Sequence, residues 1–311
     1  MPETMTRGAL IESLVAVTKA GELGPDIYFN KEDLTYQEGI RSAFGGSQLG
    51  QSAAAAAATV PPTFQIYSMQ CVFLRPIKPK AKVHYFVERT LDGRVFASRI
   101  VRATQGSDNA CFYTATICFQ RNDLQTGNVL DYHVPIPEEA KVLPDSIRGG
   151  KAQEMMAAIT DRSTPLIQLS AKEEPFDWRP FDHPHVEEPT KFWQRSFVRS
   201  PAVASNNPHV HQSALAFLSD TFTIGAALHA NPKKVGEKLR NVAMAVTLAT
   251  SLSIHEPMAK VDEWMFLQNE TSWGSDGRVV IRQWYWDVKT GRLIMSGTQE
   301  CLVRLKDTSK L

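Results

Sequence analysis

The chain has almost no net charge and lacks a long hydrophobic run. Lysine and arginine number 34 against 33 aspartate and glutamate residues, which gives a formal net charge of +1. Nucleic-acid-binding proteins usually carry a strongly basic face, so we expect no nucleic-acid partner. The longest apolar stretch, 242–254, is shorter than the roughly 20 residues that a membrane-spanning helix needs. The beginning, Met1-Pro2-Glu3-Thr4, has an early acidic residue and no apolar core of signal-peptide length, so we do not expect secretion.

Cysteine is scarce, and its spacing excludes the common cysteine motifs. Only four cysteines occur, and no two of them form a C-x-x-C pair. All of them lie in strand-like runs, which is typical of buried, reduced thiols. A catalytic cysteine is the alternative, although no histidine lies near any of them in the sequence. The four are Cys71, Cys111, Cys118 and Cys301.

The chain contains an internal repeat, and this repeat indicates the fold. In the first half, an alanine-rich, helix-like block at 46–60 is closed by Pro61-Pro62. Runs rich in Val, Ile, Tyr and Phe follow, with turn residues between them, and we predict strands there. The predicted strands of this half are 65–74, 82–92, 94–105 and 110–120.

The second half repeats this order. A helix is predicted at 210–230, preceded by the start signal Asn207-Pro208. Turns recur at equivalent places, because Arg75-Pro76 corresponds to Glu256-Pro257 and Asp92-Gly93 to Asp276-Gly277. The predicted strands of this half are 242–255, 263–271, 278–287 and 293–304.

One long helix followed by antiparallel strands is an α+β unit, because the helix must bury its apolar face on the sheet. A sheet that curls round such a helix is the hotdog arrangement. We therefore predict a double hotdog, two fused domains whose sheets join side by side and so leave fewer exposed edges. The predicted boundaries are 1–121 for the first domain, 122–172 for a linker with a short helix near 151–159, and 173–306 for the second domain. The remaining edges favour self-association, and we expect a homodimer.

The last residues form an address signal. The chain ends in Ser309-Lys310-Leu311, the tripeptide that a peroxisomal import receptor reads. The polar residues 307–311 form a tail that such a receptor could grip. We therefore expect delivery to the peroxisomal matrix, with the import receptor as a partner.

Short motifs in a fixed order make the chain resemble a known family. Phe44-Gly45-Gly46-Ser47-Gln48 opens the first helix, and Phe73-Leu74-Arg75-Pro76 ends the next strand. Val210-His211-Gln212, Leu218-Ser219-Asp220 and Thr298-Gln299-Glu300 follow in the second half. Together they resemble the type II acyl-CoA thioesterases, the bacterial enzymes and their peroxisomal relatives, over most of the chain. The resemblance implies hydrolysis of acyl-CoA to a free acid and CoA, without a metal or other cofactor.

The family uses an Asp, a Thr or Ser, and a Gln, and the resemblance assigns these roles to Asp220, Thr247 and Gln299. Asp220 also stands out by itself, because the residues at 214–228 are otherwise nearly all small or apolar. A carboxylate in such a helix is costly unless it is hydrogen-bonded, and its pKa is raised. We expect it to accept a proton from the attacking water, which Gln299 and Thr247 help to hold. A surface-facing Asp is the alternative.

Two departures from the family concern positions near the predicted site. Ala249-Thr250 stands where the family commonly has an Asp-His pair, and Gln70 stands where a His is frequent. We expect these differences to affect the preferred acyl chain length. Thr250 and Ser251 are alternatives to Thr247 as the hydroxyl residue.

CoA carries phosphates, so basic residues should contact it. The insertion at 231–240 is the candidate segment, and a solvated loop is the alternative. Its basic residues are Lys233, Lys234, Lys238 and Arg240.

Other functions fit the sequence less well. His183-Pro184-His185 and His209-Val210-His211 suggest a metal, but the prolines favour turns and the spacing supplies no third ligand. A hotdog enoyl-CoA hydratase would carry an Asp-x-Asn-Pro-x-His pattern, and here Ser205 and Val210 occupy its Asp and His positions. A non-catalytic acyl-CoA-binding protein and a thioesterase of one secondary-metabolite pathway stay open.

Overall fold

A computed structural model describes residues 9–34, 42–78, 80–106, 110–123, 127–141, 144, 175–180, 184 and 186–306. Within these residues one sheet of twelve strands forms the frame, in the order β1-β2-β4-β5-β6-β3-β9-β12-β11-β10-β8-β7. Every neighbouring pair is antiparallel. The strands of the first half are β1 (Val17–Lys19), β2 (Ile27–Asn30), β3 (Phe64–Phe73), β4 (Val83–Asp92), β5 (Phe96–Gln105) and β6 (Cys111–Arg121). Those of the second half are β7 (Asp177–Pro180), β8 (Trp193–Arg199), β9 (Val242–Ile254), β10 (Met265–Ser275), β11 (Arg278–Asp287) and β12 (Leu293–Leu305).

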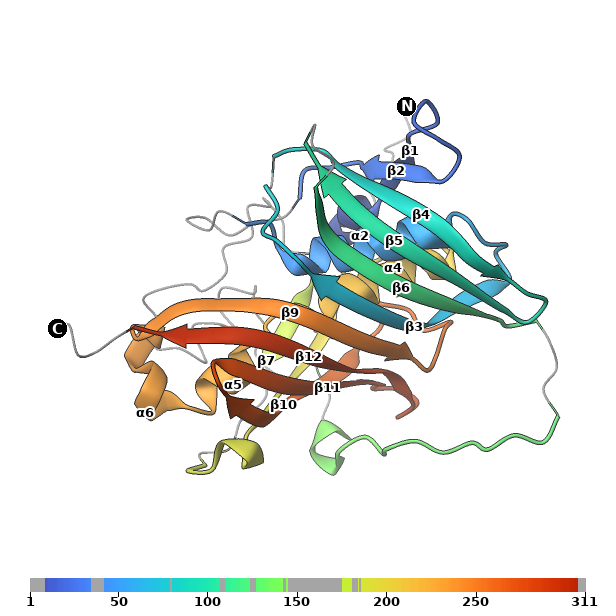
Figure 1. Cartoon of the computed structure of the whole chain (residues 1–311). Coiled ribbons are helices and arrows are strands. Elements are labelled where there is room, and N and C mark those ends of the chain that lie inside the picture. The colour runs from blue at the N-terminus through green and yellow to red at the C-terminus, as the bar shows by residue number, and fades with distance from the viewer. Residues whose placement is uncertain are drawn as a thin grey trace, which may run out of the picture.

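Two helices, one from each half, lie against each other on one face of the sheet. They are α2 (Gly45–Ala57) and α4 (Pro208–Leu218), and the strands β4, β5 and β6 curve in front of them (Figure 1). Asn207 caps α4, since its side chain accepts a hydrogen bond from the His209 N–H at 3.1 Å, and Pro208 follows at the first helical position. No helix in the described part of the chain is long and apolar enough to cross a membrane. The shorter helices are α1 (Leu10–Val15), α5 (Gly225–His229), α6 (Pro232–Val235) and the 3-10 turns η1 (Glu138–Lys141), η3 (Pro189–Lys191) and η4 (Glu237–Leu239).

The two halves are joined through their sheets and through a shared core. β3 pairs with β9 from Ser68↔Ser253 to Val72↔Ala249, which makes the two sheets continuous. Gln212 of α4 reaches across this seam, because its Oε1 accepts from the Ile66 N–H at 3.1 Å and its Nε2 donates to Gln65 Oε1 at 3.0 Å. One hydrophobic cluster contains residues of both halves. The predicted double hotdog is therefore the observed architecture.

The predicted strands agree with the observed ones within two residues at most ends, but other elements were wrong or missed. The single helix predicted at 210–230 is interrupted, because α4 ends at Leu218 and α5 begins at Gly225. Between them Phe222 adopts a left-handed φ of 60°, which an uninterrupted α-helix does not allow. β10 extends to Ser275, beyond the predicted end at 271. The strands β1, β2, β7 and β8 were not predicted.

The domain boundaries stay a prediction. β6 ends at Arg121, and β7 begins at Asp177. The linker helix near 151–159 and the tail at 307–311 lie outside the described residues.

Glycine at position 50 permits the close approach of α2 and α4. A Cβ atom there would lie 2.9 Å from the Ser213 carbonyl oxygen and 2.8 Å from Val15 Cγ1. We expect Gly50→Ala to lower the free energy of unfolding by about 1–3 kcal/mol through overpacking, despite the better helix propensity of alanine. Urea denaturation measures this change. Gly21→Ala is the control, since nothing lies within 4 Å of its Cβ position, and a Gly50→Ala protein as stable as this control would contradict the prediction.

Candidate functional site

Asp220, Thr247 and Gln299 meet on the inner side of the sheet in the second half, where Gln299 is buried and Asp220 and Thr247 are partly buried. Asp220 follows α4 directly, Thr247 lies on β9, and Gln299 lies on β12. The Thr247 hydroxyl donates to Asp220 Oδ1 at 3.0 Å, and Gln299 Nε2 donates to the same oxygen. Gln299 Nε2 also lies 3.0 Å from Thr247 Oγ1. The structure thus brings together the three residues that the sequence predicted, and their catalytic roles stay a prediction.

A β-bulge turns Thr247 towards Asp220. Along β9, Ala249 pairs with Glu300 and Thr247 pairs with Cys301, so Leu248 is the extra residue of the bulge. Strict alternation from the buried Thr250 would point Thr247 to the opposite face of the sheet. The bulge lets both threonines face inwards, and only Thr247 bonds to the carboxylate. Ser251 follows Thr250 on β9, so its side chain faces the opposite side of the sheet. Of the three candidate hydroxyl residues, Thr247 is therefore the one whose contacts fit the predicted role.

The beginning of α2, which belongs to the first half, completes the site. A Cβ atom on Gly45 would lie 2.7 Å from Asp220 Oδ2, so glycine is required for this approach. The Gly46 N–H also bonds to the Asp220 carboxylate. The first N–H groups of a helix have no partner within the helix and attract negative charge. These two glycines were recognised in the sequence as part of a motif, but no local pattern showed that they would lie beside Asp220.

Burial sets the electrostatics of the site. Removal from solvent raises the pKa of Asp220 to about 6, while the hydrogen bonds from Thr247, Gln299 and the Gly46 N–H act in the opposite direction. Burial, with a smaller contribution from the Asp220 charge, raises the pKa of Tyr285 and of Cys301 well above their ordinary values. Asp220 is therefore a carboxylate able to take up and release a proton near neutral pH.

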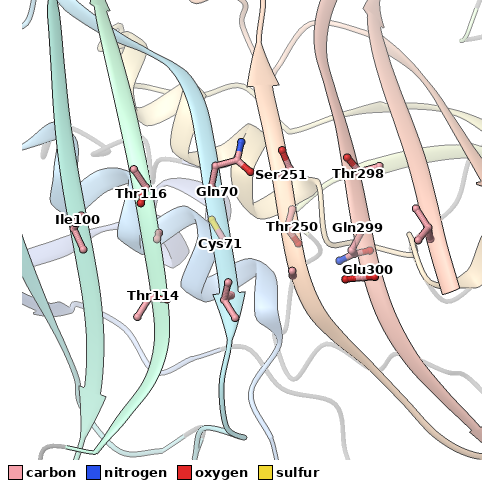
Figure 2. A pocket seen from close by; sticks show the side chains of 14 residues that line it. Gln70, Cys71, Ile100, Thr114, Thr116, Thr250, Ser251, Thr298, Gln299 and Glu300 are labelled. Carbon is pink, nitrogen blue, oxygen red and sulfur yellow. The ribbon is translucent and has the colours of Figure 1, made fainter. Parts of the chain in front are cut away.

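The open groove of the sheet is distinct from this cluster. A groove of about 620 Å³ crosses the seam of β3 and β9, with lining residues on β5, β6, β3, β9, β12 and β11, and Figure 2 shows Gln70 and Ser251 side by side at the seam. Exposed side chains on the face opposite α2 and α4 line much of it, among them Val72, Thr116 and Thr298. Of the three clustered residues only Gln299 borders the groove, and Gln299 is 1% exposed. The groove is therefore not the place where the three side chains meet.

The basic residues predicted to contact CoA lie on and after α6. Lys233, Lys234 and Arg240 are exposed, and Lys233 Nζ lies 4.0 Å from Glu187 Oε1. The side chain of Lys238 lies outside what the structure describes. Contact with CoA phosphates stays a prediction for all four.

Histidines and cysteines take structural positions. His209 Nε2 lies 2.7 Å from the Phe64 carbonyl oxygen, and His211 Nδ1 accepts from the Val261 N–H at 3.2 Å. No group of three or more metal-ligating side chains occurs within the described ranges, and His183 and His185 lie outside them. The four cysteines are free thiols, and burial raises the pKa of Cys71 to about 12.

Comparison with protein families gives two matches. Residues 36–120 match the model of the acyl-CoA thioesterase N-terminal domain, and residues 144–303 match that of the acyl-CoA thioesterase C-terminal domain. Together these ranges contain the cluster of Asp220, Thr247 and Gln299 and the glycines at the start of α2.

Individual proteins are similar along most of their length. Human acyl-coenzyme A thioesterase 8 is 29% identical over 85% of this chain and 81% of its own. Peroxisomal acyl-coenzyme A thioester hydrolase 1 of Saccharomyces cerevisiae is 21% identical over 93% of this chain and 94% of its own. The crystal structure of the acyl-CoA thioesterase II TesB2 from Mycobacterium marinum superimposes with a TM-score of 0.71 and 21% identity, covering 96% of this chain and 99% of that one. The last comparison confirms the fold.

The raised pKa of Asp220 predicts a dependence of stability on pH. Because the folded state holds this proton up to about pH 6 and an unfolded Asp releases it near its ordinary pKa of 3.8, the free energy of unfolding falls as pH rises between these values. The neutral variant Asp220→Asn should therefore be more stable than the wild type at pH 8, by on the order of 1–3 kcal/mol, and the difference should shrink towards about pH 4. Urea denaturation across this range measures it. A wild type that is the more stable protein at pH 8 would rule out the raised pKa.

Proposed function

The chain belongs to the acyl-CoA thioesterase family, and on that basis we propose that Asp220, Thr247 and Gln299 activate a water molecule that hydrolyses an acyl-CoA thioester. The family membership makes the chain a thioester hydrolase. The observation that carries the mechanism is the single hydrogen-bonded cluster that these three side chains form around Asp220 Oδ1. The products are a free carboxylic acid and CoA.

The two oxygens of the Asp220 carboxylate have different surroundings. Oδ1 accepts from Thr247 and from Gln299, which fixes the plane of the carboxylate. Oδ2 lies towards the start of α2, close to Gly45. We assign Oδ2 as the oxygen that accepts a proton from the attacking water. Gln299 Oε1 is buried without a partner among the described residues, and it is an available acceptor for the second hydrogen of that water.

The reaction then follows from direct attack of water. The water oxygen bonds to the thioester carbonyl carbon while its proton passes to Asp220, and the carbonyl oxygen becomes negative. The carbon–sulfur bond breaks when this oxyanion collapses, and the proton on Asp220 returns to the CoA sulfur. A carboxyl group with a pKa of about 6 suits both transfers, because it gains and loses a proton at small cost near neutral pH.

The oxyanion requires a hydrogen-bond donor, and the start of α2 is the donor that we propose. The Gly45 N–H lies at the positive end of a helix of 13 residues, next to the carboxylate, whereas the Gly46 N–H is already bonded to Asp220. In this arrangement the first half supplies the electrostatic stabilisation and the second half supplies the base.

Other reaction classes have less support. A covalent route through Cys71 or Cys301 would require a thiolate, and burial raises the pKa of both thiols. This chain lacks the Asp and His that an enoyl-CoA hydratase needs, because Ser205 and Val210 stand at their positions. A purely acyl-CoA-binding protein has no need of a buried carboxylate with a raised pKa, so the binding function alone leaves Asp220 unexplained.

Removal of the base should abolish most of the activity. We expect Asp220→Ala to lower kcat in a thiol-release assay by about 10²–10⁴-fold, because general-base catalysis contributes that much. Gln299→Ala should have a similar effect, and Thr247→Val a smaller one of about tenfold, the size of one lost hydrogen bond.

In the wild type, kcat/KM should rise with pH to a plateau above about pH 6, since the ionised carboxylate is the active form.

Thr298→Ala provides the matched control for these variants. Thr298 precedes Gln299 on β12, but it is exposed on the opposite face of the sheet. Its replacement should leave kcat and the pH profile unchanged. Near-normal hydrolysis by Asp220→Ala would refute the assignment of the base.

We also propose that the protein works in peroxisomes. This proposal is supported by the tripeptide Ser309-Lys310-Leu311 and by the yeast relative that is named as a peroxisomal thioester hydrolase. A fluorescent protein fused to residue 1 should give puncta that coincide with a peroxisomal marker, and deletion of residues 309–311 should make the signal diffuse. Puncta that persist after the deletion would exclude import through this tripeptide. The homodimer stays a prediction, which sedimentation equilibrium of the purified chain measures.

A further inference from the structure

Three carboxamide side chains lie directly opposite one another on neighbouring strands of the second half. Gln194 on β8 pairs with Asn269 on β10, and Asn269 pairs with Gln283 on β11. Their exposed fractions are 4%, 1% and 0%. We call this set the amide row. Facing side chains in such pairs have Cβ atoms about 4.5–5.5 Å apart, so the three amides form a continuous polar strip in the interior.

The amide row is not satisfied by the protein itself. Gln194 Oε1, Asn269 Oδ1 and Gln283 Nε2 are buried without a hydrogen-bond partner in the described part of the chain. Among the described side chains, the Tyr285 hydroxyl forms a hydrogen bond to the row, because it donates to Gln283 Oε1 at 2.9 Å. Buried polar groups are normally paired, so a whole row that is not paired requires an explanation.

Several buried amides elsewhere in this protein are paired on both atoms. Gln51 donates to the Leu14 carbonyl oxygen at 2.8 Å and accepts from Tyr85 at 2.7 Å. Gln212 bonds to three groups across the seam of the two halves. The fold is therefore able to satisfy an internal glutamine. Among the described residues, the unpaired buried amide atoms belong to the amide row and to Gln299 of the catalytic cluster.

The amide row begins one step away from the catalytic cluster. On the paired strands β11 and β12, Ile281 is opposite Gln299 and Gln283 is opposite Gly297, so Gln283 is the diagonal neighbour of Gln299, at roughly 7–8 Å. Tyr285, which bonds to Gln283, lies close enough to Asp220 that the charge of Asp220 contributes to raising the pKa of Tyr285. Thr221, next to Asp220 in the chain, has a buried hydroxyl without a partner among the described residues. The unpaired polar groups thus extend from the catalytic cluster to the amide row within the second half.

The helix α5 covers the far end of the row. A Cβ atom on Gly225, the first residue of α5, would lie 3.6 Å from Gln194 Oε1. Ala226 and Ala227 of α5, and Ala230 directly after it, pack with Ile281 and Cys301 beside the row. α5 has five residues and is separated from α4 by a non-helical link, so a ligand at the row requires a shift of α5 but no unwinding of α4.

We propose that the amide row binds the acyl group of the substrate, and that this acyl group carries neutral hydrogen-bonding substituents such as hydroxyl, oxo or epoxide oxygens. The inference rests on the proposed function, because it places the thioester carbonyl at the cluster of Asp220 and Gln299 and extends the acyl chain under α5. Carboxamides both donate and accept hydrogen bonds, so the row suits hydroxylated chains and leaves plain hydrocarbon chains with its polar atoms unpaired.

A charged acyl group does not fit this layer. Two arginines are buried in the described residues, Arg99 in the first half and Arg195, and Arg195 bonds to Gln268 on the opposite face of the sheet from the row. Asp220 places a negative charge at the catalytic end of the row. At the other end the imidazole of His229 lies beside Gln194, since a Cβ atom on Gly225 would be 3.4 Å from His229 Cε1 and 3.6 Å from Gln194 Oε1. A second carboxylate on the acyl chain would add to the negative charge of Asp220 and would find no buried lysine or arginine on this face among the described residues, which is unfavourable.

A thiol-release assay with matched substrates tests the proposal. The substrates are octanoyl-CoA and its mid-chain hydroxy, ω-hydroxy and ω-carboxy derivatives. For the wild type we expect kcat/KM to be at least about tenfold higher for one of the hydroxylated substrates than for octanoyl-CoA, and lowest for the ω-carboxy compound. In the double variant Asn269→Leu/Gln283→Met, this preference should disappear, so that the ratio of kcat/KM for the hydroxylated substrate to kcat/KM for octanoyl-CoA falls to about one.

Gln268→Met is the matched control. Gln268 neighbours Asn269 in the chain, but it faces the other side of the sheet, where its amide bonds to Arg195 and Glu270. The control should keep the wild-type preference. A wild type that hydrolyses octanoyl-CoA as fast as the hydroxylated substrates overturns the inference but leaves the thioesterase function standing. A double variant with an unchanged preference has the same consequence. That second result is expected if the row binds only ordered water.

A binding measurement separates the inference from the proposed function. We expect the hydroxylated octanoic acid that corresponds to the preferred substrate to raise the Tm of the wild type more than octanoic acid does, and the double variant to lose this difference. If no acyl-CoA is hydrolysed but this shift is observed, the proposed function fails while the amide row is retained as a site for polar acyl groups. An equal shift by both acids overturns the inference, whether or not the double variant folds.

Discussion

The main-chain pairing of β3 with β9 is the constraint on which the rest of the structure depends. This seam makes two sheets into one, and it holds α2 and α4 against each other on the same face. The start of α2 reaches Asp220 for this reason alone, since the residues concerned are about 175 positions apart in the chain. A site assembled in this way needs both halves, because neither contains the carboxylate and the helix start together.

Asp220 is held between two opposing effects. Desolvation favours its protonated form, and the three hydrogen bonds from Thr247, Gln299 and the Gly46 N–H favour the charged form. If burial acted alone, the carboxyl group would stay protonated at neutral pH and could not accept a proton. If the hydrogen bonds dominated, it would be too weak a base. The balance between a closed interior and a few polar contacts therefore defines what this residue can do.

The sequence predicts the repeated elements well, because the periods of apolar residues and the turn residues are local signals. The family resemblance pointed to Asp220, Thr247 and Gln299, with Thr250 and Ser251 as alternatives to Thr247, and their catalytic roles stay a prediction. The bulge at Leu248 could not be predicted, since it depends on how β9 pairs with β12 and leaves no distinctive residue in the sequence. The amide row was missed for the same reason: Gln194, Asn269 and Gln283 are isolated polar residues until strand register aligns them. The break after Leu218 was hidden because its flanking residues keep a helical pattern, while Phe222 alone adopts the left-handed conformation.

Fusion of the two hotdog units has a consequence for how such a protein can evolve. Two identical units related by symmetry would carry the same residues in both helices, and every substitution would act twice. In the single chain, α2 is built of Gly, Ala, Ser, Gln and Leu without any acidic residue, whereas the carboxylate follows α4. The helix α2 therefore does not have to retain a catalytic base, and its glycine-rich start can specialise in close packing against the other half. The interior of the second unit is equally free to acquire selectivity without altering its twin.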